Sequence, residues 1–338
     1  MQKNSYDHHF SRVKTPWDDD PDITESESYI LDKYKEHYYS RHPKLVQSDE
    51  YKIINSFSVH TCPYCESSDI TKRGFTSNHI QRYWCLDCHK TFTILTGTIF
   101  QDHKISISEW IEYLLDLFNY SSISLASKVN KNAFTTSKYW LSKVFLLLED
   151  YQDDIILKGD VIIDETYYTV IKKDITSKDG KKLRGISRNQ YCIATAKDDD
   201  YIYLSLEGLG KSTKHKTLKA YKDHIEPRSH LIHDDENSHK VLVDELDLID
   251  ECYLSSYLNS LEDKENPLNS LDHIHFLLKD FLGQHSGFSR SELQGYLDLF
   301  AFMMNPPHDK LEKVRVLLEK AIITKKTLKY RDYFAKND

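Results

Sequence analysis

Residues 160–168 are DVIIDETYY, in which a short apolar run is followed by the carboxylate of Asp164. This stretch begins the part of the chain that decides the fold. The Val161-Ile162-Ile163 run is typical of a strand buried on both faces. Further strand patterns alternate downstream with helical ones. We expect strands at 191–196, 201–206, 229–234 and 251–254, and helices at 216–225, 238–246, 268–282 and 289–304. Strands first, followed by alternating helices and strands, predict one α/β domain with a mixed sheet.

Three acids of this domain are candidate metal ligands. Asp164 ends the buried strand, where a carboxylate is costly unless a cation or a partner compensates it. Asp234 ends a later strand, and Asp272 lies on a long helix. On that helix His275 and Lys279 share the stripe of Asp272. Three converging carboxylates suit a pair of Mg²⁺ or Mn²⁺ ions, the arrangement used for phosphodiester chemistry. The chain has 53 Asp and Glu, so spacing alone does not separate these acids from surface residues.

Upstream, two Cys-x-x-Cys pairs stand nineteen residues apart, formed by Cys62, Cys65, Cys85 and Cys88. This spacing predicts a zinc ribbon, in which four thiolates close a tetrahedral site around one structural Zn²⁺. The alternative is a pair of disulfides. Nothing in the sequence indicates secretion, and Cys192 and Cys252 stand alone in strand-like runs, which favours zinc. Because ribbons bind DNA, RNA or protein, this motif does not define the function.

Three helical patterns follow the cysteines, over 108–118, 124–129 and 135–148. The short second helix and the longer third helix fit a helix-turn-helix whose third helix enters a major groove. In that arrangement the residues presented to DNA are Thr136, Lys138, Tyr139 and Lys143. An ordinary helical hairpin produces the same pattern, but the position directly after the cysteine pairs favours the DNA-reading interpretation.

Composition places further bounds on the chain, which has 338 residues, 39% of them apolar, and a net charge of −8. It begins with polar residues, and no apolar run approaches the roughly 20 residues of a membrane span, so we expect a cytoplasmic protein with reduced thiols and no membrane partner. The acidic total argues against nucleic acid. Basic residues nevertheless gather in blocks at 172–188, 211–222 and 310–331, and three such blocks favour a polyanionic partner over solvated faces.

Four stretches carry a family resemblance: CPYC…RYWCLDCHKTFTILTGTIF, DVIIDETYY, HDDENSH and NPLNSLDHIHFLLKDFLGQHSGFSRSELQGYLDLFAFMMN. Over about residues 58–305 they resemble bacterial insertion-sequence transposases of the DDE type, in the group with an N-terminal zinc ribbon and helix-turn-helix. The resemblance implies an α/β catalytic domain with a ribonuclease-H-like mixed sheet and flanking helices. It also implies Mg²⁺- or Mn²⁺-dependent cleavage and joining of double-stranded DNA at element ends, and a homo-oligomer that brings two ends together.

The resemblance also assigns roles to residues. Asp164, Asp234 and Asp272 fall on the three metal-binding acids, and Lys279 on a basic residue of the same helix. Many relatives have Gly where this chain has Asp235, so Asp234 and Asp235 are rival candidates for the second acid. Glu165 is expected to point to the opposite face of its strand from Asp164. The lysines expected to hold phosphates are Lys211, Lys214, Lys216 and Lys219.

The expected organisation is a polar, partly disordered arm (1–57), a zinc ribbon (58–95), a helix-turn-helix DNA-binding segment (105–150), a ribonuclease-H-like catalytic domain (158–305) and a basic C-terminal helix and tail (306–338). Two other functions remain open. A non-catalytic DNA-binding regulator derived from a transposase has no need of all three acids. A nuclease of ribonuclease-H-like fold would cut DNA without joining it.

Overall fold

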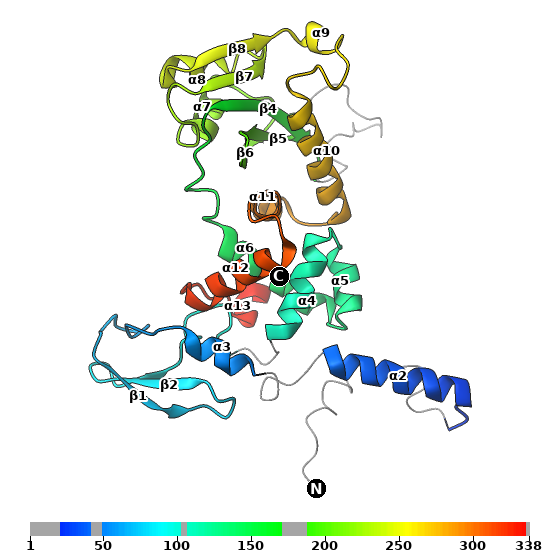
Figure 1. The fold of residues 1–338 in the computed structure, drawn as a ribbon, viewed down its shortest axis with the longest axis vertical. Coiled ribbons are helices and arrows are strands. Elements are labelled where there is room, and N and C mark those ends of the chain that lie inside the picture. The colour runs from blue at the N-terminus through cyan, green and yellow to red at the C-terminus, as the bar shows by residue number, and fades with distance from the viewer. Residues whose placement is uncertain (1–20, 42–48, 103–106, 171–187, 336–338) are drawn as a thin grey trace. The chain divides into compact units, whose positions relative to one another are not determined.

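The computed structural model describes residues 21–41, 49–102, 107–170 and 188–335. The chain divides into two compact units (Figure 1). The first comprises Met1–Asn119, Ile123–Lys143 and Val314–Asp338, and the second comprises Tyr120–Ser122 and Val144–Lys313. Most of the basic block at 172–188 lies outside the described residues. No helix in the described ranges is long and apolar enough to cross a membrane.

The first unit contains a small antiparallel sheet in the order β1-β2-β3, formed by β1 (Ile70–Phe75), β2 (Gln81–Cys85) and β3 (Thr91–Phe92). Its core is Cys62, Cys85 and Phe92, each at most 3% exposed. With so few apolar residues, this sheet has little hydrophobic burial of its own.

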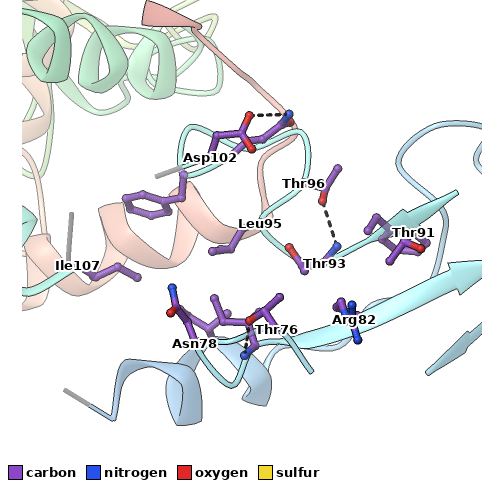
Figure 2. Close-up of a pocket in the computed structure, with 14 residues that line it drawn as sticks. Thr76, Asn78, Arg82, Thr91, Thr93, Leu95, Thr96, Asp102 and Ile107 are labelled. Atoms are coloured by element: carbon purple, nitrogen blue, oxygen red, sulfur yellow. Dashed lines mark hydrogen bonds between the residues drawn. The ribbon is translucent and has the colours of Figure 1, made fainter. Parts of the chain in front are cut away.

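A pocket of about 310 Å³ lies beside this sheet, lined by residues of β2, β3 and the segment that follows them (Figure 2). Its hydroxyl groups are engaged in local structure. Thr76 Oγ1 accepts from the backbone N–H of Ile80 at 3.1 Å, and Thr96 Oγ1 accepts from that of Thr93 at 3.0 Å. These bonds fix the two loops that border the pocket.

The helices of the N- and C-terminal parts are α2 (Glu25–Arg41), α3 (Glu50–Ser56), α4 (Ile107–Phe118), α5 (Ile123–Val129), α6 (Phe134–Leu148), α12 (Lys310–Ile323) and α13 (Tyr330–Ala335). Helices α4 and α6 pack through stacked indole rings, with the centroids of Trp110 and Trp140 4.7 Å apart. The hydroxyl of Tyr113 donates to the carbonyl of Ser137 at 2.6 Å. The three helices predicted between 108 and 148 are present, with starts within one residue of those expected.

The second unit is built on a five-stranded sheet in the order β6-β5-β4-β7-β8 (Figure 1). Its strands are β4 (Asp160–Tyr168), β5 (Tyr191–Lys197), β6 (Ile202–Leu209), β7 (His230–Asp234) and β8 (Ile249–Tyr253). Strands β4, β5 and β6 pair antiparallel, whereas β7 and β8 run parallel to β4. This order and these directions define a ribonuclease-H-like sheet, so the predicted α/β fold with a mixed sheet is confirmed.

The remaining helices are α7 (Lys214–Tyr221), α8 (Lys240–Leu246), α9 (Ser255–Leu258), α10 (Asn269–Gln284), the 3₁₀ turn η2 (Arg290–Glu292) and α11 (Leu293–Met304). A buried cluster joins one sheet face to α7 and α8, and includes Val161, Ile163, Leu231, Tyr221 and Leu242. Because side chains alternate along a strand, Asp164 lies on the face opposite to Val161 and Ile163.

The outer edge of β6 is bonded to side-chain amides. Gln152 and Asn305 each donate to and accept from the β6 backbone, and Gln294 accepts from it, at distances from 2.7 to 3.1 Å. Asp298 Oδ1 in turn accepts from the amides of Gln152, at 2.8 Å, and Gln294, at 2.9 Å. These groups satisfy backbone donors and acceptors that an edge strand otherwise leaves open to another chain.

Candidate active site

Two acids stand side by side on the central parallel strands, Asp164 in the middle of β4, which continues to Tyr168, and Asp234 at the carboxyl end of β7. Ile162 of β4 pairs with Ile232 of β7, and two residues further along each strand lie Asp164 and Asp234. The register of the parallel pair therefore brings both carboxylates to one edge of the sheet. The two carboxylates also interact electrostatically, because the negative charge of Asp234 raises the pKa of Asp164.

Helix α10 adds a third acid and a histidine. The helix is anchored by buried Leu271, Ile274 and Leu278. Asp272 and His275, one turn apart, therefore fall on one face of the helix beside that apolar stripe. The structure brings Asp164, Asp272 and His275 together, with one possible ligand atom from each lying within 4.8 Å of the others. Nδ1 of His275 is 3.8 Å from Oδ2 of Asp164.

The carboxyl group of Asp164 is the most perturbed acid of this site. Burial, followed by the negative charges of Glu165 and Asp234, raises its pKa to about 7, against the lowering effect of a backbone hydrogen bond that Glu165 donates at 2.8 Å. Burial also raises the pKa of Asp272. For His275, burial lowers the pKa to about 4, so the ring is neutral at physiological pH. A neutral imidazole and crowded carboxylates are a donor set that a divalent cation would stabilise.

A buried hydrogen-bonded chain lies behind these acids. His239, which precedes α8, contacts both carboxylate oxygens of Glu165 through Nε2, at 3.0 and 3.1 Å. Its Nδ1 is 3.2 Å from Nδ1 of His233 and 3.5 Å from Oδ1 of Asp234. The other nitrogen of His233 is 2.8 Å from Oδ1 of Asp250. Burial alone would lower the pKa of His239, but the hydrogen bond and charge of Glu165 raise it.

The histidine chain was not predicted from the sequence. Its signal is a strand histidine directly before Asp234 and a second histidine at the start of the next helix, six residues on. Glu165 does lie on the α8 side of the sheet, as the alternation of strand side chains predicts.

Two other predicted residues, Asp235 and Lys279, are exposed. The side chain of Asp235 is exposed and accepts from the backbone N–H of Ser255, at 3.2 Å, and from its hydroxyl, at 2.8 Å. Asp234 is therefore the acid beside Asp164, and Asp235 fixes the start of α9. Lys279 is exposed on α10, two turns beyond Asp272.

The four cysteines of the first unit form one cluster. The sulfurs of Cys62 and Cys88 are 3.6 Å apart, and those of Cys65 and Cys85 are 3.5 Å apart. These separations are too long for disulfides and close to the edge of about 3.8 Å of a tetrahedron with metal–sulfur bonds of about 2.3 Å. Backbone hydrogen bonds, the largest from Cys88, lower the pKa of Cys85 to about 7. The cluster fits one Zn²⁺.

The predicted DNA-reading face of α6 is only partly exposed. Thr136 and Lys138 are half-buried near the start of the helix. Tyr139 donates its hydroxyl hydrogen to the carbonyl of Leu328, so this side chain is held inside the first unit. The prediction for Lys143 is wrong, because its side chain is buried and Nζ donates to the carbonyl of Ile99 at 2.5 Å.

The predicted phosphate-binding lysines surround the start of α7. Lys211, Lys214 and Lys219 are exposed. Lys216 differs, because its Nζ donates to the carbonyls of Leu209, at 2.8 Å, and Lys211, at 3.1 Å. Lys216 therefore holds the loop between β6 and α7 together, which leaves three lysines of the predicted set directed to solvent.

The strand order and the carboxylate cluster define a ribonuclease-H-like domain with a candidate two-metal site. No protein-family model matches the chain. An uncharacterized protein in transposable element ISH50 of Halobacterium salinarum is 29% identical over 128 residues, which are 37% of this chain and 42% of that protein. The match thus spans less than half the length of that relative. It confirms the predicted resemblance to insertion-sequence proteins. It does not test the prediction that the chain belongs to the group with an N-terminal zinc ribbon and helix-turn-helix.

Solved structures of Mos1 transposase also align with the chain. The catalytic domain with raltegravir and Mn is 14% identical, covering 54% of this chain and 90% of that one, with a TM-score of 0.29. The Mos1 mariner paired end complex with Mn is 11% identical, covering 95% of this chain and 97% of that one, with a TM-score of 0.27. Scores this low support no structural inference, and the fold assignment rests on the strand order.

Proposed function

We propose that this chain is a DDE-type transposase, which cuts DNA at the ends of an insertion sequence and joins those ends to a target. The observation that supports the proposal is the position of Asp164 on a ribonuclease-H-like sheet, beside Asp234 of the neighbouring strand and within reach of Asp272 and His275 of α10. Similarity to a protein of a transposable element supports the same function.

In this proposal the three carboxylates hold two divalent ions, Mg²⁺ or Mn²⁺. Such ions make a bound water or 3′-hydroxyl more acidic and stabilise charge on the leaving oxygen. The chain's own residues position these groups. The hydrogen bond between Glu165 and His239 ties the middle of β4 to the start of α8, and exposed Lys279 would contact a phosphate of the DNA end.

The first unit would bind the DNA. We assign one structural Zn²⁺ to the four cysteines and contacts with the element ends to the α4–α6 helices, with the half-buried Thr136 and Lys138 as the readers. Exposed Lys211, Lys214 and Lys219 would hold phosphates without reading sequence. Because two ends must be joined in one event, we also propose that the active form is a homo-oligomer on double-stranded DNA.

A cleavage and strand-transfer assay tests the proposal, with the DNA that flanks the gene as substrate and Mg²⁺ or Mn²⁺ present. The wild-type protein should give both nicked and joined products. Asp164→Asn removes a charged ligand with little change of shape, so it should give neither product while DNA binding and the circular dichroism spectrum persist. Cleavage without joining would instead identify a nuclease, and sequence-specific binding without cleavage would identify a regulator.

A further inference from the structure

The histidine of the acid cluster has no hydrogen bond that explains its burial. His275 is 7% exposed, and its Nε2 is buried without a partner among the described residues. Its Nδ1 faces Oδ2 of Asp164 at 3.8 Å, which is beyond hydrogen-bond distance. Buried polar groups in native proteins are nearly always paired, so the nitrogen that faces Asp164 without bonding to it calls for an explanation such as an ion between the two side chains.

The spacing around His275 suits a shared ion. Two ligand atoms that each bind one cation at about 2.1 Å lie at most about 4.2 Å apart, and somewhat closer at tetrahedral or octahedral angles. The separation of 3.8 Å between His275 and Asp164 falls within this limit. The carboxylate of Asp272, one turn before His275, completes the set. A neutral imidazole that binds a cation through Nδ1 would keep its proton on Nε2.

We propose that His275 is a direct metal ligand, and that the ion shared by Asp164, Asp272 and His275 is a transition metal ion such as Mn²⁺ in preference to Mg²⁺. Carboxylate oxygens suit both ions, whereas imidazole nitrogen binds transition metals better than Mg²⁺. The inference rests on the proposed function, since it assigns a fourth ligand and a metal preference to the same site.

Metal binding tests the inference without reference to activity. The full chain is loaded with Zn²⁺ so that the cysteines are occupied, and Mn²⁺ and Mg²⁺ are then titrated by calorimetry. The electron spin echo modulation of bound Mn²⁺ reports nitrogen atoms in its coordination shell. His275→Phe keeps a buried ring and removes both nitrogens. It should lower the affinity for Mn²⁺ by about tenfold or more, change that for Mg²⁺ much less, and abolish the nitrogen signal.

A matched control comes from the far end of α10. His285 is also buried, and neither of its ring nitrogens has a partner among the described residues. His285→Phe should leave both affinities and the nitrogen signal unchanged. If His275→Phe does not fold, His275→Gln provides the same comparison with a smaller change in polarity.

The outcomes separate this inference from the proposed function. If Asp164→Asn abolishes Mn²⁺ binding but His275→Phe keeps the nitrogen signal and the preference for Mn²⁺, the ligand assignment is wrong and the acid site stands. If Asp164→Asn leaves binding of both ions unchanged, there is no catalytic metal site at these acids, and both proposals fail.

Discussion

His239 donates from Nε2 to the carboxylate of Glu165, and both side chains are nearly inaccessible to solvent, at 0% and 5% exposure. Glu165 directly follows Asp164, so the bond ties the middle of β4 to the start of α8. The same histidine approaches Asp234, at the end of β7, at 3.5 Å. One buried side chain thus contacts both of the strands that carry the acids, and it would hold the separation of the acids constant when metal and DNA are absent.

Glu165→Gln should reduce the rate of cleavage on the order of tenfold with little change in DNA affinity, because the amide can still accept one hydrogen bond but no longer compensates a charged His239. The pKa of His239 should fall, because Glu165 raises it more than the charges of Asp234 and Asp164 do. A histidine NMR titration checks this shift. An unchanged pKa would show that the pair does not set the charge of His239.

The same pair makes a pH-dependent contribution to stability. The folded-state pKa of His239 is raised, so its contribution is complete below the unfolded value of about 6.5 and is lost as pH rises through the folded value. The difference in Tm between wild type and Glu165→Gln should therefore be larger at pH 6 than at pH 9.

Asp234→Asn and Asp235→Asn should differ sharply. Asp234→Asn removes a proposed metal ligand and should abolish cleavage. Asp235 bonds to Ser255 and is exposed, so its substitution should cost a few-fold in activity at most. Both variants are compared in the strand-transfer assay at matched DNA occupancy. Activity that survives in Asp234→Asn and is lost in Asp235→Asn would exchange the two assignments.

The sheet and the placement of the acids could be predicted because they depend on local patterns. The apolar run before Asp164 and the alternation of strand side chains place that residue on one face. Helical spacing likewise places His275 beside Asp272. Lys143 shows where prediction from local patterns fails. It lies three residues after Trp140, within the apolar stripe of α6, but only the fold shows that the carbonyl of Ile99 is there to accept from its ammonium group.

The histidine chain could not be predicted for a related reason. His233 and His239 belong to different elements, and their contact depends on how the loop after β7 turns into α8. Glu165 lies on a third element. Side-chain pairing across three elements leaves no periodicity in the sequence, so the pattern showed that Glu165 faces away from Asp164 without showing its partner.

Cys85→Ser should remove zinc and unfold the small sheet. The sheet's buried core consists of Cys62, Cys85 and Phe92, so little else would stabilise it once the proposed ion is lost. Metal analysis of freshly reduced protein should give one Zn²⁺ per wild-type chain and less than a tenth of that in the variant. Cys252→Ser, at an exposed position on β8, is the control and should keep its zinc. Wild-type protein without zinc would refute the assignment.

Lys214→Ala and Lys219→Ala should weaken binding to all DNA sequences alike. Each removes one exposed cation, so the slope of log affinity against log salt should decrease by about one per substitution. Lys216→Ala should act differently, since its ammonium group holds two backbone carbonyls: thermal stability should fall while the salt slope stays close to that of wild type. Fluorescence anisotropy at several salt concentrations measures these slopes, and a flattened slope in Lys216→Ala alone would reverse the assignment.

Asp298→Asn should make stability less dependent on pH. Asp298 is 5% exposed, and burial raises the pKa of its carboxyl group to about 6 against the hydrogen bonds from Gln294 and Gln152. Because the folded-state pKa is raised, the contribution of Asp298 is complete below about pH 4 and is lost as pH rises through about 6. Asparagine keeps the oxygen that accepts from both glutamines and cannot ionise.

From pH 4 to pH 8 the free energy of unfolding of Asp298→Asn should therefore rise relative to wild type by about 3 kcal/mol, at roughly 1.4 kcal/mol per pKa unit. Urea unfolding at the two pH values measures this change. Asp298→Ala is the matched control: it removes the acceptor as well as the charge, leaves both glutamine amides short of one bond, and should be less stable than Asp298→Asn at both pH values. If the free energies of unfolding of wild type and Asp298→Asn changed in parallel with pH, Asp298 would not titrate near pH 6. The glutamine amides at the edge of β6 would then be held by a carboxylate that is ionised from pH 4 to pH 8.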